Sequence, residues 1–318
     1  MQFFDGAAVD RALSYPALVD VLGAAFRTGA IAPLRHHHTI ALDSRPEATL
    51  LLMPAWQASA PGAATAGRYL GVKSVTVFPD NASRGKPAVF GTYLLFSAET
   101  GETLAVMDAA RLTAWRTGAA SALASRYLSR PDSQRLLMVG AGVLAPQLIR
   151  AHASVRPIRE VAIWNRSAPR ARDLAARLAD TGLAITVADD LETAVRAADI
   201  VSTATISSEP LVHGAWLRPG THVDCVGAYR PGMRETDDEV VRRARIFVDT
   251  RTGAFGEAGD ILQPIKSGVI GKEAVLADLF DLTRGTSTGR RTPEEITLFK
   301  SVGAAIEDLA AAVAVYGT

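Results

Sequence analysis

A glycine-rich turn at residues 135–145 predicts cofactor chemistry. The apolar run Arg135-Leu-Leu-Met-Val leads into Gly140-Ala-Gly142-Val-Leu-Ala145, and a helical pattern follows at once. In a G-x-G-x-x-A motif the first glycine permits a tight turn and the second lets the backbone approach a pyrophosphate. The N-terminus of the following helix offers unpaired N–H groups to the same anion. The sequence therefore predicts a dinucleotide site at Gly140 and Gly142, with an ordinary glycine turn as the alternative.

The end of the next predicted strand bears on which dinucleotide binds. NAD-specific sites usually place Asp or Glu there to bind the ribose hydroxyls, whereas this chain has Asn165, Arg166 and Ser167. Arg166, with Arg170 or Arg172 nearby, can pair with a 2′-phosphate, to which Asn165 and Ser167 can donate hydrogen bonds. We therefore expect NADPH to be preferred and NADH to be possible. The alternative is a solvated arginine cluster at the start of a helix.

Two cations are candidates for binding a substrate. Lysine is scarce, with five lysines among 34 basic residues, and Lys73 lies in the apolar strand pattern of residues 70–78. An unpaired ammonium is costly to bury there, so Lys73 needs a charged ligand or an acidic partner unless it faces solvent. A lowered pKa would suit proton transfer or Schiff-base chemistry, and a charged ammonium would bind a carboxylate. Arg116 lies among small residues on a predicted helix, where it is either a binding arginine or a surface one.

Three consecutive histidines follow Arg35 at the start of the first predicted strand. Strand alternation places Arg35 and His37 on one face and His36 and His38 on the other. The three imidazoles therefore cannot converge on one metal, and Cys225 has no matching ligand motif, so we predict no metal site. His37 either helps to position a substrate or is a hydrogen-bonded structural histidine.

The composition is that of an ordinary globular protein of about two domains. Among 318 residues, 48% are hydrophobic and 21% charged, with a formal net charge of +1, so neither disorder nor a nucleic-acid surface is expected. A lone cysteine, Cys225, and an N-terminus without a signal-peptide pattern favour the cytoplasm. The uncharged residues 48–67 contain Pro54 and Pro61, so we expect a strand and then a loop there instead of a membrane helix.

Hydrophobic periodicity divides the chain into two regions. We expect a helical N-terminus over 5–29 and a helix over 110–128, which flank short β-rich runs with turn residues between them. These antiparallel strands are predicted at 34–42, 48–53, 69–78, 89–96 and 103–107. Beyond Pro131, strands and helices alternate as in a parallel sheet covered by helices. Its strands are predicted at 135–139, 160–164, 184–187, 200–203, 222–227 and 246–248, and residues 293–316 are predicted to be helical.

Several blocks of residues share their order and spacing with a known family. They are Pro33-Leu-Arg35, Leu52-Met53-Pro54-Ala55, residues 71–81 and 112–120, the Gly140 motif, Thr203-Ala-Thr205 and residues 219–222. Over nearly its whole length the chain resembles the ornithine cyclodeaminase and mu-crystallin family. The resemblance implies an α/β protein that forms a homodimer. Residues 1–112 with 292–318 would be an α+β substrate-binding and dimerisation domain, and residues 113–291 a Rossmann-type NAD(P)-binding domain.

The resemblance also implies roles for single residues. Arg35, Lys73 and Arg116 would hold a substrate carboxylate beside the nicotinamide. Lys73 is the first candidate for a proton donor, with Tyr229, His37 or a bound water as alternatives. The residues implied to line the cofactor site, besides the two glycines and the arginine cluster, are Val143, Leu144, Asn165, Thr203, Thr205, Asp224 and Val226.

One position departs from the cyclodeaminases. They carry an aspartate where this chain has Tyr229, and a phenol that titrates near ~10 replaces neither its charge nor its basicity. The segment 227–235 instead resembles family members that reduce Δ1-pyrroline-2-carboxylate or Δ1-piperideine-2-carboxylate. We therefore expect NAD(P)H-dependent reduction of a cyclic imino acid to L-proline or L-pipecolate. The alternatives are a cyclodeaminase, an amino-acid dehydrogenase, or a ligand-binding protein without turnover.

Overall fold

The computed structural model describes residues 1–43, 45–57 and 68–318, which form two compact units. The first unit comprises residues 1–116 and 304–318, and the second comprises residues 117–303. The boundary falls within helix α3 (Ala109–Leu128), directly after Arg116. The sequence-based division placed its boundaries at 112/113 and 291/292. The loop expected at 58–67 lies outside the described residues, and none of the helices described is long and apolar enough to cross a membrane.

The first unit contains a six-stranded sheet in the order β1-β6-β5-β4-β3-β2. Its strands are β1 (Gln2–Phe4), β2 (His36–Ile40), β3 (Ala48–Trp56), β4 (Tyr69–Val77), β5 (Val89–Ser97) and β6 (Thr103–Asp108). The five predicted strands are confirmed as antiparallel neighbours. Strand β1 was not predicted, and it adds to the edge in parallel with β6. Three residues are too few to show a period of two.

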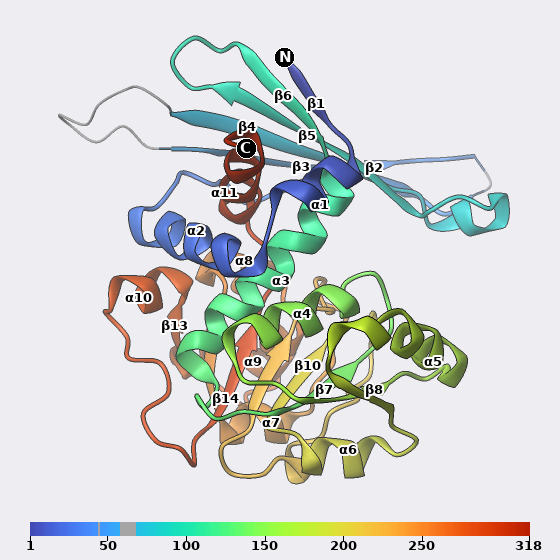
Figure 1. Ribbon diagram of the computed structural model, residues 1–318, viewed down its shortest axis with the longest axis vertical. Coiled ribbons are helices and arrows are strands. Elements are labelled where there is room, and N and C mark those ends of the chain that lie inside the picture. Colours follow the sequence, from blue (N-terminus) through green and yellow to red (C-terminus); the bar gives the residue numbers. More distant parts are fainter. Residues whose placement is uncertain (44, 58–67) are drawn as a thin grey trace. The chain divides into compact units, whose positions relative to one another are not determined.

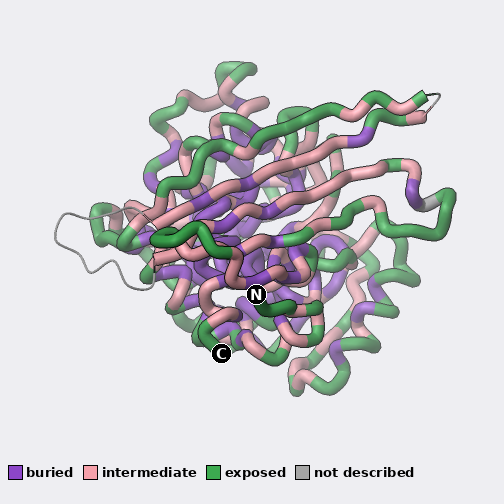
Figure 2. The backbone as a smooth tube through the Cα atoms, turned by 90° about the horizontal axis from the view of Figure 1, so that it is seen from above, coloured by how far each residue is buried: buried purple, intermediate pink, exposed green. Residues whose placement is uncertain are grey.

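The helices α1 (Gly6–Ala12), α2 (Tyr15–Thr28) and α11 (Ala305–Tyr316) belong to this unit, together with the first part of α3. The helical region expected at 5–29 consists of two helices, because Leu13 and Ser14 are extended and Ser14 caps a new helix with Pro16 in its first turn. Helix α11 packs against α2 and against β3, β4 and β5 (Figure 1). The opposite face of these strands carries half-buried and exposed residues (Figure 2). One face of the sheet is therefore covered by helices within the unit.

The second unit contains an eight-stranded parallel sheet in the order β13-β12-β14-β11-β10-β7-β8-β9. Its strands are β7 (Arg135–Val139), β8 (Glu160–Trp164), β9 (Ala184–Val187), β10 (Ile200–Thr203), β11 (His222–Cys225), β12 (Ala244–Val248), β13 (Val275–Asp278) and β14 (Ile296–Lys300). From β9 to β11 the chain order is 3-2-1-4-5, as in dinucleotide-binding sheets, and it reverses between β7 and β10. The predicted Rossmann-type architecture is confirmed.

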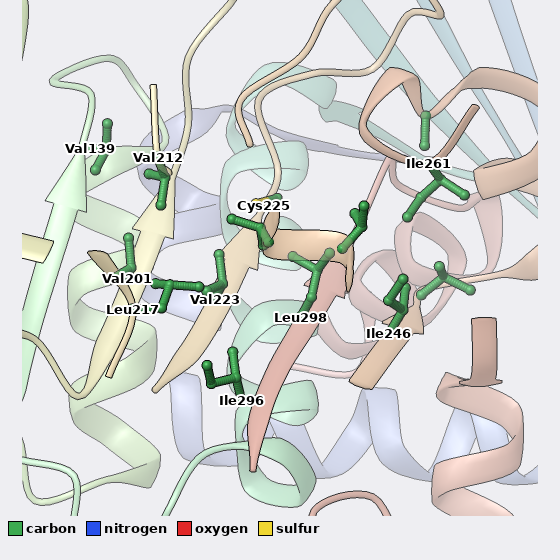
Figure 3. Close-up of a cluster of buried hydrophobic side chains, with 14 of the residues drawn as sticks. Val139, Val201, Val212, Leu217, Val223, Cys225, Ile246, Ile261, Ile296 and Leu298 are labelled. Carbon is green, nitrogen blue, oxygen red and sulfur yellow. The ribbon is translucent and has the colours of Figure 1, made fainter. Parts of the chain in front are cut away.

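Helices separate these strands along the chain. They are α4 (Ala145–Val155), α5 (Ala168–Arg177), α6 (Leu191–Ala197), α7 (Asp238–Arg243), α8 (Arg251–Glu257), α9 (Gly259–Lys266) and α10 (Leu279–Arg284). On one side of the sheet Val139, Val201, Val223 and Leu298 come from neighbouring strands and share an apolar core (Figure 3). This core fixes the strand ends from which the cofactor loops emerge.

The prediction of a helix over 293–316 is wrong in its first part. Residues 296–300 form β14, which pairs with β11 and β12 in the middle of the sheet. All five residues of this strand are buried, so its sequence shows no alternation between apolar and polar faces. Only residues 305–316 form the expected helix.

Candidate active site

Lys73 occupies a buried ion-pair cluster in the first unit. It lies on β4, where its side chain points to the helix-covered face and is only 2% exposed. Its Nζ is 2.8 Å from Asp308 Oδ2 and 2.9 Å from Asp308 Oδ1, and it donates to Thr113 Oγ1 at 3.2 Å. The alternative of a solvent-facing lysine is therefore wrong, and the expected acidic partner is Asp308.

Arg116 completes the same cluster from α3. Its Nε donates to Asp308 Oδ1 at 2.9 Å and its Nη1 donates to Glu307 Oε2 at 2.8 Å. The side chain is buried, so the alternative of a surface arginine is also wrong. Within the described part of the chain, no acceptor engages Nη2. This amino group has donors left for a ligand.

The electrostatics of the cluster suit a proton donor. The pKa of Lys73 is lowered to about 8, because burial and the charges of Arg116 and Arg35 outweigh the opposing effect of Asp308. Burial alone would raise the pKa of Asp308, but Lys73 and Arg116 hold it below its usual value. Asp308 is therefore an anion, and Lys73 is a cation that loses its proton only slightly above neutral pH.

The remaining candidates of the first unit lie at its edge. Arg35 directly precedes β2 and is half-buried, and its charge is felt by Lys73. His37 lies exposed on β2, opposite Leu51. The rings of His36 and His38 are 6.3 Å apart, as expected for side chains on one face of a strand. Among the residues described, no three His, Cys, Asp or Glu side chains gather as metal ligands.

The acidic half of the cluster was missed from the sequence. Glu307 and Asp308 are the only charged residues in the last 18 positions, on a helix that is otherwise apolar and rich in alanine. Since charged side chains on a buried helix need partners, this isolated acidic pair was the available signal. The sequence showed that Lys73 needed an anion, but it did not show which one.

Tyr93 is a second residue that sequence reasoning missed. It lies on β5 opposite Lys73, fully buried, and its hydroxyl has no hydrogen-bond partner in the described residues. Burial raises the pKa of Tyr93, and the negative charge of Asp308 raises it further. A Cβ at Gly71 would lie 2.1 Å from the Tyr93 Oη, so only glycine lets this ring cross β4. Tyr93 is therefore a neutral phenol beside the ion pairs.

In the second unit, the glycine turn after β7 forms an open cradle. Gly140 has a φ of 114°, which favours glycine, and its N–H donates to Trp164 O at 2.8 Å. A Cβ at Gly142 would meet nothing within 4 Å, and the neighbouring Val143 is 76% exposed. Ala145 begins α4 and is buried. The open backbone at the N-terminus of α4 fits the pyrophosphate of a dinucleotide.

The arginine cluster follows β8 at the same edge of the sheet. Because Gly140 bonds to Trp164, the segment that begins at Asn165 lies next to the glycine turn. Asn165 Nδ2 donates to Ser167 O at 3.0 Å. Arg166 and Arg170 are exposed and form no ion pair in the parts of the chain that are described. Their charges are thus available to an anion such as a 2′-phosphate.

Asp224, which we expected at the cofactor site, has hydrogen-bond partners inside the second unit. Its side chain is completely buried and accepts hydrogen bonds from Ser121 at 2.8 Å and from Ser202 at 2.7 Å. His152 Nε2 lies 3.0 Å from its other oxygen, and these contacts hold the pKa of Asp224 below its usual value in spite of burial. The side chain joins β11 to α3 and α4, so we assign it a positioning role. Thr203 and Val226 are buried at the strand ends, where Val226 N donates to Thr203 O at 3.0 Å.

A buried carboxylate joins the loops that follow β10 and β11. Glu235 Oε1 accepts hydrogen bonds from Thr205 N at 2.7 Å and from Thr205 Oγ1 at 2.9 Å. Its Oε2 accepts from the backbone N–H of Gly227 at 2.8 Å and of Ala228 at 3.1 Å. A Cβ at Gly227 would lie 2.1 Å from the Thr205 backbone, so the two loops are in direct contact. Glu235, which the sequence did not single out, thus fixes this wall of the crevice.

Lys300 supplies the counter-charge for that carboxylate. Its Nζ lies 2.9 Å from Asp260 Oδ2 and 3.9 Å from Glu235 Oε2, and all three side chains are fully buried. Tyr229 follows the same loop, is half-buried against the apolar core, and has the Arg230 guanidinium 5.5 Å from its ring centroid. Glu235 and Lys300 therefore hold the start of the loop that carries Tyr229 in place.

Comparison with known proteins shows the family to which the chain belongs. The model of the ornithine cyclodeaminase/mu-crystallin family matches residues 3–318. The chain belongs to this family. Within it, the chain is 41% identical over 288 residues to the Δ1-pyrroline-2-carboxylate reductase of Paracoccus denitrificans, covering 88% of this chain and 89% of that protein.

Solved structures of family members have the same fold. The Δ1-pyrroline-2-carboxylate reductase of Thermococcus litoralis, in complex with NADH and L-proline, is 34% identical with a TM-score of 0.91, covering 100% and 97% of the two chains. An archaeal alanine dehydrogenase dimer with bound NAD is 33% identical with a TM-score of 0.89, covering 100% and 95%.

Proposed function

We propose that the protein reduces a cyclic imino acid with NAD(P)H, converting Δ1-pyrroline-2-carboxylate or Δ1-piperideine-2-carboxylate to L-proline or L-pipecolate. The observation that carries this proposal is the buried cluster of Lys73 and Arg116 with Asp308. It combines a donor with a pKa near neutrality and a guanidinium with unused N–H groups. Relatives named as pyrroline-carboxylate reductases, one of them solved with NADH and L-proline, support the same reaction.

The substrate carboxylate is assigned to the cations of the first unit. Arg116 keeps Nη2 for the ligand while Asp308 and Glu307 fix its other nitrogens, so the guanidinium is held in one orientation. Arg35 contributes positive charge from the edge of β2. The Nη2 group of Arg116, with the Lys73 ammonium in the same cluster, favours binding of an anionic imino acid.

We assign Lys73 the transfer of a proton to the imine nitrogen. The imine nitrogen gains a proton as its carbon gains a hydride, and the Lys73 ammonium donates that proton before solvent restores it. Asp308 keeps the ammonium in place through both carboxylate oxygens. Tyr93 stays a neutral phenol, because burial and the negative charge of Asp308 both raise its pKa. His37 remains a proposed substrate-positioning residue.

The second unit is assigned the cofactor, which supplies the hydride when bound. The backbone of Gly140, Gly142, Val143 and Leu144 would hold the pyrophosphate at the N-terminus of α4. Asn165, Arg166, Ser167 and Arg170 would hold a 2′-phosphate, which favours NADPH over NADH. The loops that contain Thr203, Thr205 and Val226 would hold the nicotinamide half, since they follow the strands beyond the reversal of strand order.

We further propose a homodimer that works in the cytoplasm. The uncovered face of the first sheet carries half-buried apolar side chains from three adjacent strands, among them Leu52, Trp56, Leu70, Val72 and Leu94. An apolar face of this kind suits burial against a second copy. Cys225 is a free, buried thiol, as is usual in a reducing compartment.

Absorbance at 340 nm tests the proposed reaction. Purified protein is mixed with NADPH and Δ1-pyrroline-2-carboxylate, with parallel reactions that contain NADH, the six-membered imine, or pyruvate with ammonia. A further reaction contains ornithine and is assayed for ammonia. We expect NADPH loss that depends on a cyclic imine, and no ammonia from ornithine. NADPH loss only with pyruvate and ammonia would instead identify an amino-acid dehydrogenase.

A further inference from the structure

The second unit contains a cavity that the proposed reaction does not use. It has a volume of about 800 Å³ and is lined by the end of α3, by Arg156 after α4, and by the segments that precede β11 and β14. These segments lie at the amino-terminal edge of the parallel strands. The dinucleotide crevice lies at the carboxyl-terminal edge. The cavity is therefore separate from the proposed cofactor site.

The lining of the cavity is strongly cationic. It contains Arg126, Arg130, Arg156, Arg290 and Arg291, against only two carboxylates, Asp132 and Glu294. Arg130 is neutralised by its pairing with Asp132 at 3.1 Å and with the nearby Asp199 at 3.0 Å. Besides Asp132, the only carboxylate that lines the cavity in the described part of the chain is Glu294, which is exposed.

Two of these arginines are held in place by neutral oxygens alone. Arg156 donates to the backbone carbonyls of Ser125, Arg126 and Ser129 and to the Ser129 hydroxyl. Arg290 donates to carbonyls that include Leu128 and Gly220, and to the Thr297 hydroxyl. Neither forms an ion pair in the part of the chain that is described, although both are half-buried. Carbonyl dipoles hold these groups but do not cancel a full charge.

The arginines also act on one another. Burial together with the charges of Arg130 and Arg156 lowers the pKa of Arg290 to about 10, although the charge of Glu295 acts in the opposite direction. Burial and the charge of Arg126 lower the pKa of Arg156. A bound anion would relieve this repulsion without any change in the backbone contacts that fix the two half-buried arginines.

We propose that this cavity binds a small anion with two or more phosphate or carboxylate groups. Arg156 and Arg290 supply fixed charge at its wall, and Arg126 and Arg291, both exposed, add positive charge to its lining. The cavity volume suits a metabolite of that size, and arginine pairs well with either kind of anionic group. The site does not depend on the proposed reaction.

Titration calorimetry on the full protein tests the site. The protein is first saturated with NADPH, or with NADH, so that the dinucleotide crevice is filled, and then titrated with pyrophosphate or with citrate. We expect one equivalent of at least one probe to bind, and added salt to weaken the binding. A preference for pyrophosphate identifies a phosphate ligand, and a preference for citrate identifies a polycarboxylate. If neither probe binds at concentrations up to about 10 mM, the proposal is overturned.

Variants locate the binding. The double change Arg126→Gln and Arg291→Gln should raise the dissociation constant about tenfold or more, because it removes the two exposed charges and leaves the structural arginines in place. Arg242→Gln, on the exposed surface of α7, is the matched control and should change nothing. The single variant Arg291→Glu, in an exposed segment, provides the same test if the double variant folds poorly. Unchanged affinity in these variants would place the anion elsewhere and overturn the assignment.

Discussion

The Lys73 ammonium lies 2.8 Å from the Asp308 carboxylate, although the two residues are 235 positions apart in the chain. Strand β4 and the last helix thus share one buried ion pair, to which Arg116 adds a second cation. Both the proposed chemistry and the stability of the first unit depend on this pair.

The titration of Lys73 should be visible in the pH dependence of imine reduction. Its pKa of about 8 means that the protonated donor predominates below pH 8 and falls tenfold for each pH unit well above it. We expect kcat/KM for imine reduction to fall in the same way. In Lys73→Arg the charge remains but no longer titrates in this range, so the low residual activity should lose that decline. A decline that persists unchanged would belong to the imine itself.

Removal of the Lys73 side chain should nearly abolish turnover. Lys73→Ala loses the proposed proton donor, which is typically worth about 10² to 10⁴ in rate. Because Lys73 lies in the first unit and the dinucleotide motif in the second, the affinity for NADPH, measured by its fluorescence, should be retained. Normal turnover by this variant would remove Lys73 from the mechanism.

Removal of the buried anion should destabilise the protein. Asp308→Asn leaves Lys73 and Arg116 without their shared carboxylate, and breaking a buried pair in this way costs about 3–5 kcal/mol. Urea denaturation should show the loss, and Glu99→Gln on an exposed turn is the control with no expected effect. If Asp308→Asn unfolds at the same urea concentration as the unmodified protein, the ion-pair cluster is not a source of stability.

Arg166 should decide between the two nicotinamide cofactors. In Arg166→Gln the KM for NADPH should rise about tenfold while that for NADH changes little, because only NADPH carries the 2′-phosphate. Arg177→Gln, exposed at the end of α5, is the control. Equal effects on both cofactors would contradict the proposed phosphate site.

Tyr229 should separate reduction from deamination. Tyr229→Asp introduces the carboxylate that cyclodeaminases carry, so we expect weaker imine reduction and a trace of ammonia release from ornithine. Assays of NADPH oxidation and ammonia on the same preparations measure both. Ammonia release by the unmodified protein would show that Tyr229 does not distinguish the two reactions.

Glu235 is expected to act as a positioning residue for half of the cofactor. In Glu235→Gln the amide cannot accept all four hydrogen bonds from Thr205, Gly227 and Ala228, so the loops after β10 and β11 should shift. The Kd for NADPH should rise about tenfold, whereas that for 2′-phospho-ADP-ribose, which lacks the nicotinamide, should not change. Glu239→Gln, half-buried on α7 and outside these loops, is the control. Equal losses for both ligands would indicate general loosening of the unit.

Local sequence signals predicted most of the fold. Alternation around Lys73 and the glycine motif at 140–145 identified the antiparallel strands and the parallel sheet, since each pattern spans neighbouring residues. Strand β14 was not predicted, because a strand that is buried on both faces does not alternate between apolar and polar residues. Several cations of the candidate site could be identified for the same local reasons, because charges within apolar or small-residue segments are conspicuous.

The acidic partners of these cations could not be identified from local sequence patterns. Asp308 meets Lys73, and Glu235 meets Thr205, only through tertiary packing that no local spacing encodes. Asp224 shows the converse, because its position suggested the cofactor site while its contacts with Ser121 and His152 give it a structural task. A motif locates a residue along the chain, but the direction of its side chain depends on neighbours that come from elsewhere.

The interrupted first unit has a consequence for synthesis on the ribosome. Residues 117–303 form one continuous unit that can fold as soon as it emerges, whereas residues 1–116 must wait for 304–318. Until Glu307 and Asp308 arrive, Lys73 and Arg116 have no counter-ions to enter the interior with. The proposed catalytic centre therefore forms only after residues 304–318 have left the ribosome, later than residues 117–303 can fold.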